Sequence, residues 1–219
     1  IDQTDIEAIQ YDRVLLKIRG VKLDVRKSHP FVFVVGGVQH LTGVMTYATN
    51  SGLYVVGDEV GREIASYLYE LTHDGLNREW AKERKRRIAK GDQMWNEAIG
   101  GDRPDLATGI PKHMRNSKDV KTLLRDCGAA VDAKARRSFM VGMAHRMGER
   151  MKAMDPARPV PSDTAERIMS DKPQAESKKR RKPNYDATAI ASGAKAGETA
   201  PISWGIGKSQ AETLKISGE

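Results

Sequence analysis

The apolar positions in the first sixty residues form short runs that end at turn-forming residues, a pattern typical of β-strands. Residues 31–35 (FVFVV) are aromatic or β-branched, and further apolar runs occupy 41–49 and 53–56. Strands this close in sequence pair antiparallel, because a parallel return needs a crossover of about a dozen residues or more. The run at 5–19 fits either a helix or a strand. The pattern therefore predicts a three-stranded antiparallel meander between about residues 14 and 57.

A helical period replaces the strand pattern after residue 57. Asp58 can cap the N-terminus of a helix, and Glu59 in the first turn suits its macrodipole. The apolar stripe predicted to face the core consists of Val60, Ile64, Tyr67, Leu68 and Leu71. Beyond Gly75 the stripe thins and basic residues take over. The sequence predicts a helix over about 58–90 whose second half is a basic extension.

A second helix is predicted over about 135–154. Its apolar residues recur every three or four positions: Phe139, Met143, Met147, Met151 and Met154. Methionines at this spacing are typical of an adaptable core rather than of a ligand site. Residues 91–119, which contain glycines and prolines, are expected to form a long irregular connection.

The composition changes after residue 155. Residues 156–219 are rich in proline, glycine and basic residues, and are predicted to form a largely irregular, extended C-terminal tail behind a domain of residues 1–155. The fold class expected from these patterns is α+β: a three-stranded antiparallel meander packed on two main helices, with a basic helical extension and the tail.

The amino-acid composition limits further which kinds of protein and binding site are expected. The chain has 219 residues, 39% hydrophobic and 5% aromatic, so part of it is expected to lie outside a core. The single cysteine, Cys127, excludes an intramolecular disulfide framework and a cysteine-rich zinc site. No apolar stretch has the length of a membrane span, and no signal peptide is recognisable. We expect a protein of the bacterial cytoplasm, or one associated with a virion.

The positive charge is concentrated in two segments. Residues 78–90 carry seven Lys or Arg and two Glu, and residues 178–182 carry five cations. Each segment contributes +5 to a total of +8, so the rest of the chain sums to −2. Concentrated basic charge is typical of a nucleic-acid interface, because docking on phosphates releases counterions. The predicted phosphate contacts are Arg78, Lys82, Arg84, Lys85, Arg86, Arg87, Lys90, Lys178, Lys179, Arg180, Arg181 and Lys182.

Two tryptophans, Trp80 and Trp95, flank the first basic segment and could stack on the bases of a single strand. Ordinary packing is the alternative role for both, and a charged run can also be no more than a solvated helix face.

Signatures of catalysis and of cofactor binding are absent. The sequence contains no phosphate-binding or dinucleotide fingerprint, no metalloprotease motif and no nucleophile elbow. Its five histidines have no ligand spacing, and Gly36–Gly37 favours a hairpin turn over a phosphate cradle. We expect no enzymatic activity, no cofactor and no bound metal.

Three segments resemble a known family, in the same order along the chain. They are 53–76 (a strand ending in Val-Gly, then a helix with a Tyr-Leu pair), 135–142 (ARRSFMVG) and 187–197 (ATAIASGAKAG). They are similar to the C-terminal half of the domain-of-unknown-function 2786-like family of phages and prophages. The matching motifs are packing signals. The resemblance implies a phage or mobile-element origin and no established activity.

These observations favour a non-enzymatic nucleic-acid-binding protein of a phage or mobile element that contacts the DNA backbone, with single-stranded DNA as one option. A different class is a structural virion or assembly protein, or an oligomeric scaffold, whose C-terminal tail wraps a neighbouring subunit. An inhibitor of a host defence system is a further alternative. The expected partners are nucleic acid and further copies of the chain, in a homo-oligomer, and no membrane.

Overall fold

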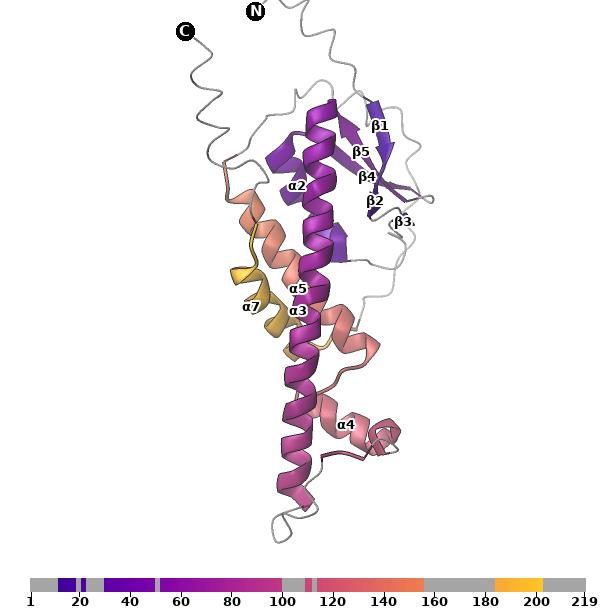
Figure 1. Ribbon diagram of the computed structural model, residues 1–219, viewed down its shortest axis with the longest axis vertical. Helices are drawn as coiled ribbons and strands as arrows, with labels where there is room; N and C mark the ends of the chain where they lie inside the picture. Colours follow the sequence, from indigo (N-terminus) through magenta and orange to yellow (C-terminus); the bar gives the residue numbers. More distant parts are fainter. Residues whose placement is uncertain are drawn as a thin grey trace, which may run out of the picture.

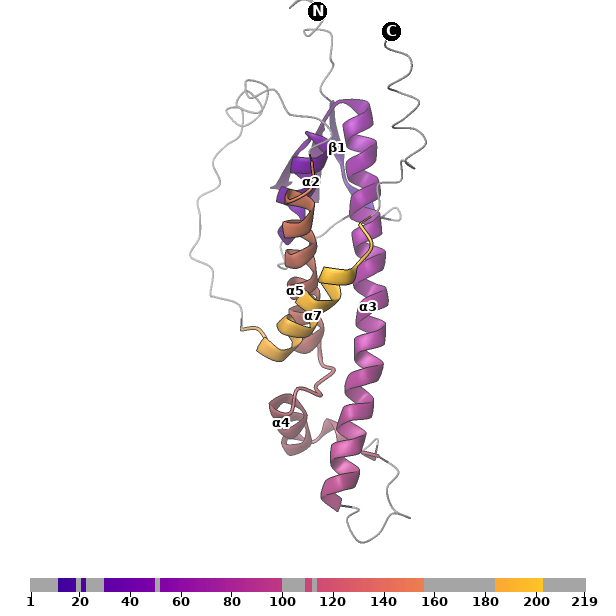
Figure 2. The same ribbon diagram turned by 90° about the vertical axis from the view of Figure 1, so that its left-hand side faces the viewer.

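Helices dominate the computed structural model, which describes residues 12–18, 21–22, 30–49, 52–99, 109–111, 114–155 and 184–202. The helices of these residues are η2 (Pro30–Phe33), α2 (Val35–Thr42), α3 (Glu59–Ile99), η4 (Met114–Asn116), α4 (Lys118–Asp126), α5 (Ala133–Lys152) and α7 (Ala187–Thr199), η denoting a 3-10 helix. Helix α3 runs the length of the molecule, with the small sheet beside its upper half and α4 beside its lower end (Figure 1). Helices α5 and α7 lie along one side of α3 (Figure 2).

The sheet has three strands, but it is not the predicted meander. Its order is β1 (Asp12–Leu15), β5 (Gly52–Gly57), β4 (Met45–Thr49), with both pairs antiparallel. A separate two-stranded ladder joins β2 (Lys17–Ile18) to β3 (Val21–Lys22). The central strand is therefore the last in sequence. The predicted architecture of a three-stranded meander on two main helices is wrong, because helices make up most of the described chain.

The error lies in residues 31–35, which form η2 and the start of α2 instead of a strand. The buried residues here are Phe31, Val34, Val38 and Leu41, whose spacing of three, four and three is helical. The run of β-branched residues concealed this period. Gly37 lies inside α2 rather than in a hairpin turn, and a Cβ there would be 2.7 Å from the carbonyl oxygen of Gly148 on α5.

Helix α3 begins as predicted but turns a different face to the core. The Asp58 carboxylate accepts a hydrogen bond of 2.8 Å from the N–H of Gly61. Val60 and Tyr67, two residues of the predicted core stripe, are 48% and 43% exposed. The buried face contains Ala65, Leu68, Tyr69, Thr72, Leu76 and Trp80. This face was not predicted, because it contains small and polar residues and the prediction relied on large apolar side chains.

Thr72 shows how a polar residue enters this core. Its hydroxyl donates to the carbonyl of Leu68 at 2.8 Å, so its burial leaves no unpaired group. The hydroxyl of Tyr69 likewise donates to Thr46 Oγ1 on the sheet, at 3.3 Å. Helix α3 also continues to Ile99, past Gly91 and beyond the end predicted near residue 90.

The methionine-rich helix α5 occupies the centre of the core. Phe139, Met143, Met147 and Met151 are all buried, which confirms this part of the predicted stripe. Met154, its last residue, lies past the end of α5 at Lys152 and is half-buried. Helix α5 contacts α2, α3 and α7. A second, smaller apolar cluster of Ile110, Val120, Leu124 and Ala129 surrounds the lower part of α3, where Trp95 packs against it.

Helix α7 lies within the segment predicted to be an irregular tail. The Asp186 carboxylate caps it by accepting from the N–H of Ala189 at 3.0 Å. Glycines let α7 pack on α5 with backbone touching backbone: a Cβ at Gly142 would overlap the carbonyl oxygen of Ile190, and one at Gly193 would overlap that of Phe139. Residues 156–183 and 203–219 of the predicted tail lie outside the described residues.

This packing predicts opposite effects for the same substitution at two helical glycines. Gly193→Ala would force α5 and α7 apart and should lower the free energy of unfolding by about 1–3 kcal/mol, the usual cost of overpacking. At Gly75 a Cβ would meet only Met143 Cε at 3.8 Å. Gly75→Ala should therefore stabilise the protein, by up to about 1 kcal/mol, through helix propensity. Urea unfolding of both variants measures the difference, and equal effects would contradict the close α5–α7 contact.

Candidate nucleic-acid interface

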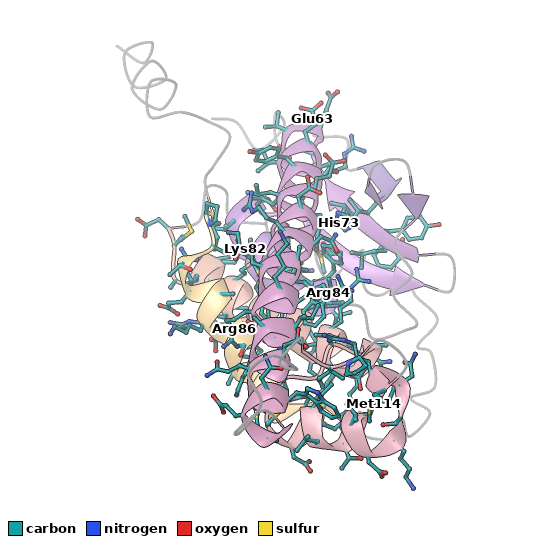
Figure 3. The ribbon with its side chains drawn as sticks, turned by 60° about the horizontal axis from the view of Figure 1, so that its bottom comes forward. Glu63, His73, Lys82, Arg84, Arg86 and Met114 are labelled. Carbon is teal, nitrogen blue, oxygen red and sulfur yellow. The ribbon has the colours of Figure 1, made fainter. Side chains whose placement is uncertain are left out.

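The predicted phosphate contacts of residues 78–90 all belong to the uninterrupted helix α3. At about 100° per residue, Lys82 and Lys85 lie within about 40° of Arg78, opposite the buried face. Arg86 lies about 80° to one side of Arg78 and Arg84 about 120° to the other. Figure 3 shows Lys82 and Arg86 on the side of α3 that faces α7, with Arg84 on the opposite side. The cations therefore cover a wide arc of the helix surface.

Most of these cations are open to solvent, and Arg78, Lys82 and Arg86 carry ion pairs with glutamates on the same helix. The side chains of Arg78, Lys82 and Arg86 are 55%, 69% and 60% exposed. Lys82 Nζ lies 2.8 Å from Glu79, and Arg86 binds Glu83 through two hydrogen bonds of 2.8 and 2.9 Å. An exposed pair such as Lys82–Glu79 contributes about 0–1 kcal/mol and can be exchanged for a phosphate. Glu83, in contrast, is buried, with 8% of its side chain exposed.

Arg84 and Lys85 are exposed, and no carboxylate of the described residues pairs with either side chain. Lys90 is also exposed, and its ammonium donates to the carbonyl oxygen of Cys127 at 2.6 Å. Residues 178–182 of the second basic segment lie outside the described residues.

Arg87, predicted as a phosphate contact, is instead buried, with 1% of its side chain exposed. Its Nε donates to Glu83 at 2.7 Å and its Nη1 to the carbonyl oxygen of Ala130 at 3.1 Å. Asp186 Oδ2 lies 3.9 Å from the same Nη1. The Arg87 guanidinium therefore joins α3 to the N-terminus of α7 and to the loop before α5, where no phosphate can reach it.

The two tryptophans pack inside the protein. Trp80 is 7% exposed, and its ring lies 5.6 Å from that of Phe139 in a tilted arrangement. Trp95 is half-buried against the cluster around Ile110. The packing role, which the sequence left open beside base stacking, is the one that the structure gives to both residues.

A groove of about 630 Å³ separates α3 from α7 beside the basic face. Phe139, Ala191 and Ala196 line its apolar part. Lys82 and Arg86 of α3 and Lys195 of α7 bring three cations to the same groove, which is also lined by the carboxylates of Glu79 and Glu83. Lys195 was missed by sequence analysis because its segment was predicted to be irregular, although the capped, alanine-rich run after Asp186 was a signal for a helix.

The carboxylates beneath the basic face are held ionised. Burial alone would raise the pKa of Glu83, but hydrogen bonds from Arg86 and Arg87 outweigh it and hold the pKa below its usual range. Burial is likewise outweighed at Asp186, whose pKa is lowered by hydrogen bonds from Thr188 and Ala189 and by the charge of Arg87. The Asp186 N–H also donates to the buried Ser138 hydroxyl at 2.8 Å, which ties α7 to α5.

The described residues offer no other chemical centre. They contain no group of three or more side chains able to hold a metal ion. His73 contacts Asp74 at 3.2 Å, and its ring stacks on the buried Phe31. None of the helices in the described ranges is both long and apolar enough to cross a membrane.

No family model, curated protein or solved structure matches the chain.

The burial of Arg87 predicts a large difference between two neighbouring arginines. Arg87→Ala leaves Glu83 and Asp186 without their shared cation and should lower the free energy of unfolding by about 3–5 kcal/mol, as is usual when a buried ion pair is broken. Arg84→Ala, on the exposed side of the same helix, should leave it nearly unchanged. Urea denaturation measures both, and a mild effect of Arg87→Ala would show that the network is solvated.

The lowered pKa values of Glu83 and Asp186 predict a loss of stability in acid. Their contribution is fully present above the usual pKa values of 4.5 and 3.8 and is lost as the pH falls through the lower values of the folded state. The free energy of unfolding should be nearly constant from about pH 7 to pH 5 and should fall below about pH 4.5.

Urea unfolding at successive pH values tests this expectation. Asp186→Asn keeps a residue suited to the helix cap but removes the titrating group, so the fall in acid should be shallower. An unchanged acid slope in this variant would exclude Asp186 as a contributor.

Proposed function

We propose that the protein binds nucleic acid through phosphate contacts from the outer face of α3, without enzymatic activity. The observation that carries the proposal is the exposure of Arg78, Lys82, Arg84, Lys85 and Arg86 on one helix, in a chain whose charge outside its two basic segments is close to neutral. Counterion release on phosphate binding gives such a face its affinity.

The packing beneath this face supports the proposal. Trp80 and Arg87 fix the rotation of α3 about its axis, so the arc of helix surface that carries the cations is set before any ligand arrives. A preorganised surface loses less conformational entropy on binding than a flexible basic chain. Lys195 adds a cation from α7 across the groove. Residues 178–182 stay predicted phosphate contacts. The proposal also includes a phage origin and a location in the bacterial cytoplasm or in a virion.

A second candidate function is an oligomeric scaffold, favoured by the upper half of α3. Val60 and Tyr67 are exposed there, and with the half-buried Ile64 and Leu71 they follow the spacing of four, three and four that is typical of helix–helix seams. A wrapping role of the whole tail receives less support, since α7 packs on α5 of its own chain.

Binding to a labelled oligonucleotide, measured by fluorescence anisotropy at several salt concentrations, tests the first proposal. About three to five phosphate contacts, depending on whether Arg78 and Lys85 reach phosphates or base edges, predict that log K falls with log salt with a slope of about −3 to −4. Arg84→Glu/Lys85→Glu should weaken binding by at least about tenfold and make the slope shallower. Arg87 stays unchanged in this test because it is part of the core.

The matched control is Lys118→Glu/Lys121→Glu, which makes the same change of charge on exposed residues of α4. It should retain most of the affinity. Undetectable binding at low salt, or equal losses in the two double variants, would overturn the proposal.

Light scattering of Val60→Glu/Tyr67→Glu tests the scaffold. An oligomer that dissociates in this variant supports the scaffold function, and a monomeric wild-type protein refutes it.

A further inference from the structure

The ligand of this surface is, we propose, duplex DNA, and residues 78–90 of α3 lie in its major groove. This inference rests on the proposed function and deepens it. Its basis is the distribution of cations around the helix, since Arg84 lies on one flank and Lys82 and Arg86 lie on the other (Figure 3).

The two flanks match the two phosphate walls of a groove. Arg84 and Lys82 are separated by about 160° around the helix axis, so one flat row of phosphates cannot contact both. A helix with its side chains is about 10–12 Å across, and the major groove of B-form DNA is about 12 Å wide. A helix placed in this groove brings each flank to a different strand. Arg78 and Lys85, between the flanks, then face the base edges.

The position of α3 allows this approach. In two views at right angles, α5 and α7 lie along one side of α3 and leave its outer side uncovered by the other helices (Figures 1 and 2). The basic segment of 13 residues is about 18 Å long at 1.5 Å per step. This is about the length over which a straight helix can follow a groove that curves around the duplex.

Acidic residues mark the upper limit of the contact. Glu63 and Glu70 are exposed on the upper half of α3, where Figure 3 shows Glu63 near the end of the helix. Their charge repels phosphate. The DNA is therefore confined to the part of α3 that also borders Lys195 and the groove to α7.

Single-stranded nucleic acid fits this surface less well. Its non-specific binders use aromatic side chains as stacking platforms, whereas Trp80 is packed on Phe139 and Trp95 lies in the second apolar cluster. The exposed Tyr67 is eleven residues, about 16 Å, from Arg78 and lies between the two acidic residues. Duplex RNA is also disfavoured, because the major groove of an A-form helix is too narrow for side chains to enter.

Three ligands of one sequence, each with the same label, separate these cases: a DNA duplex, its single strand and the corresponding RNA duplex. The full chain should bind the DNA duplex at least about tenfold more tightly than the single strand or the RNA duplex at equal salt. Arg84→Glu and Arg86→Glu, made separately, should each weaken duplex binding by a similar factor of about five to ten. Each should also reduce the salt slope by about one. An unchanged intrinsic tryptophan fluorescence spectrum, to which the buried Trp80 contributes, confirms that both variants remain folded.

The outcomes distinguish the two proposals. No binding to any of the three ligands removes the nucleic-acid function itself. Binding in which the single strand or the RNA duplex equals the DNA duplex overturns the groove assignment and leaves phosphate binding intact. An effect of only one of the two arginines also overturns it, because docking in a groove requires both flanks.

Discussion

The burial of Arg87 constrains the rest of the structure. A guanidinium with 1% exposure must be paired, since an uncompensated buried charge is far more costly than an exposed one. Its partners are Glu83 on the same helix, the carbonyl of Ala130 before α5, and Asp186 at the start of α7. Two other segments, the loop before α5 and the start of α7, are thereby held at one point of α3. Because the desolvation of such ions offsets much of their attraction, we expect this network to specify how the helices are arranged more than to stabilise them.

Close packing at glycines of α5 also fixes how the helices are arranged, in addition to the Arg87 network. Helix α5 brings Gly142 to α7 and Gly148 to η2, and at both positions a Cβ would collide with backbone of the neighbouring element. Segments 135–142 and 187–197, whose resemblance to a known family stays a prediction, are in large part the two surfaces that meet here. Their motif is accounted for by close helix contact. It does not by itself point to a ligand or a reaction.

Helices that begin with a capping residue or carry a regular apolar stripe could be predicted from the sequence. The helix α2 and the buried face of α3 could not. The Asp58 cap and the stripe from Phe139 to Met151 follow rules of local hydrogen bonding and of spacing, and both are present. The helix at Val35 was missed because strand propensity over five residues is weaker than the tertiary contacts that bury Val34 and Val38. The buried face of α3 was misplaced because polar Thr72 and small Ala65 carry no strong apolar signal.

At the candidate site, the sequence could locate the basic residues but could not show which of them are exposed. Counting residues assigns seven cations to the segment 78–90, but a count cannot tell a cation that faces solvent from one that is enclosed. Glu83 lies four residues before Arg87, a spacing that permits a pair on one helix face, yet it also lies three residues before Arg86, and the sequence does not decide between them. The structure shows that Glu83 binds both arginines, and that Arg87 is enclosed while Arg86 remains 60% exposed. The same carboxylate therefore supports the core and orients one of the cations at the surface. It follows that the charge available to a ligand is set by the rotation of α3, which depends on the packing of α5 and α7 against it.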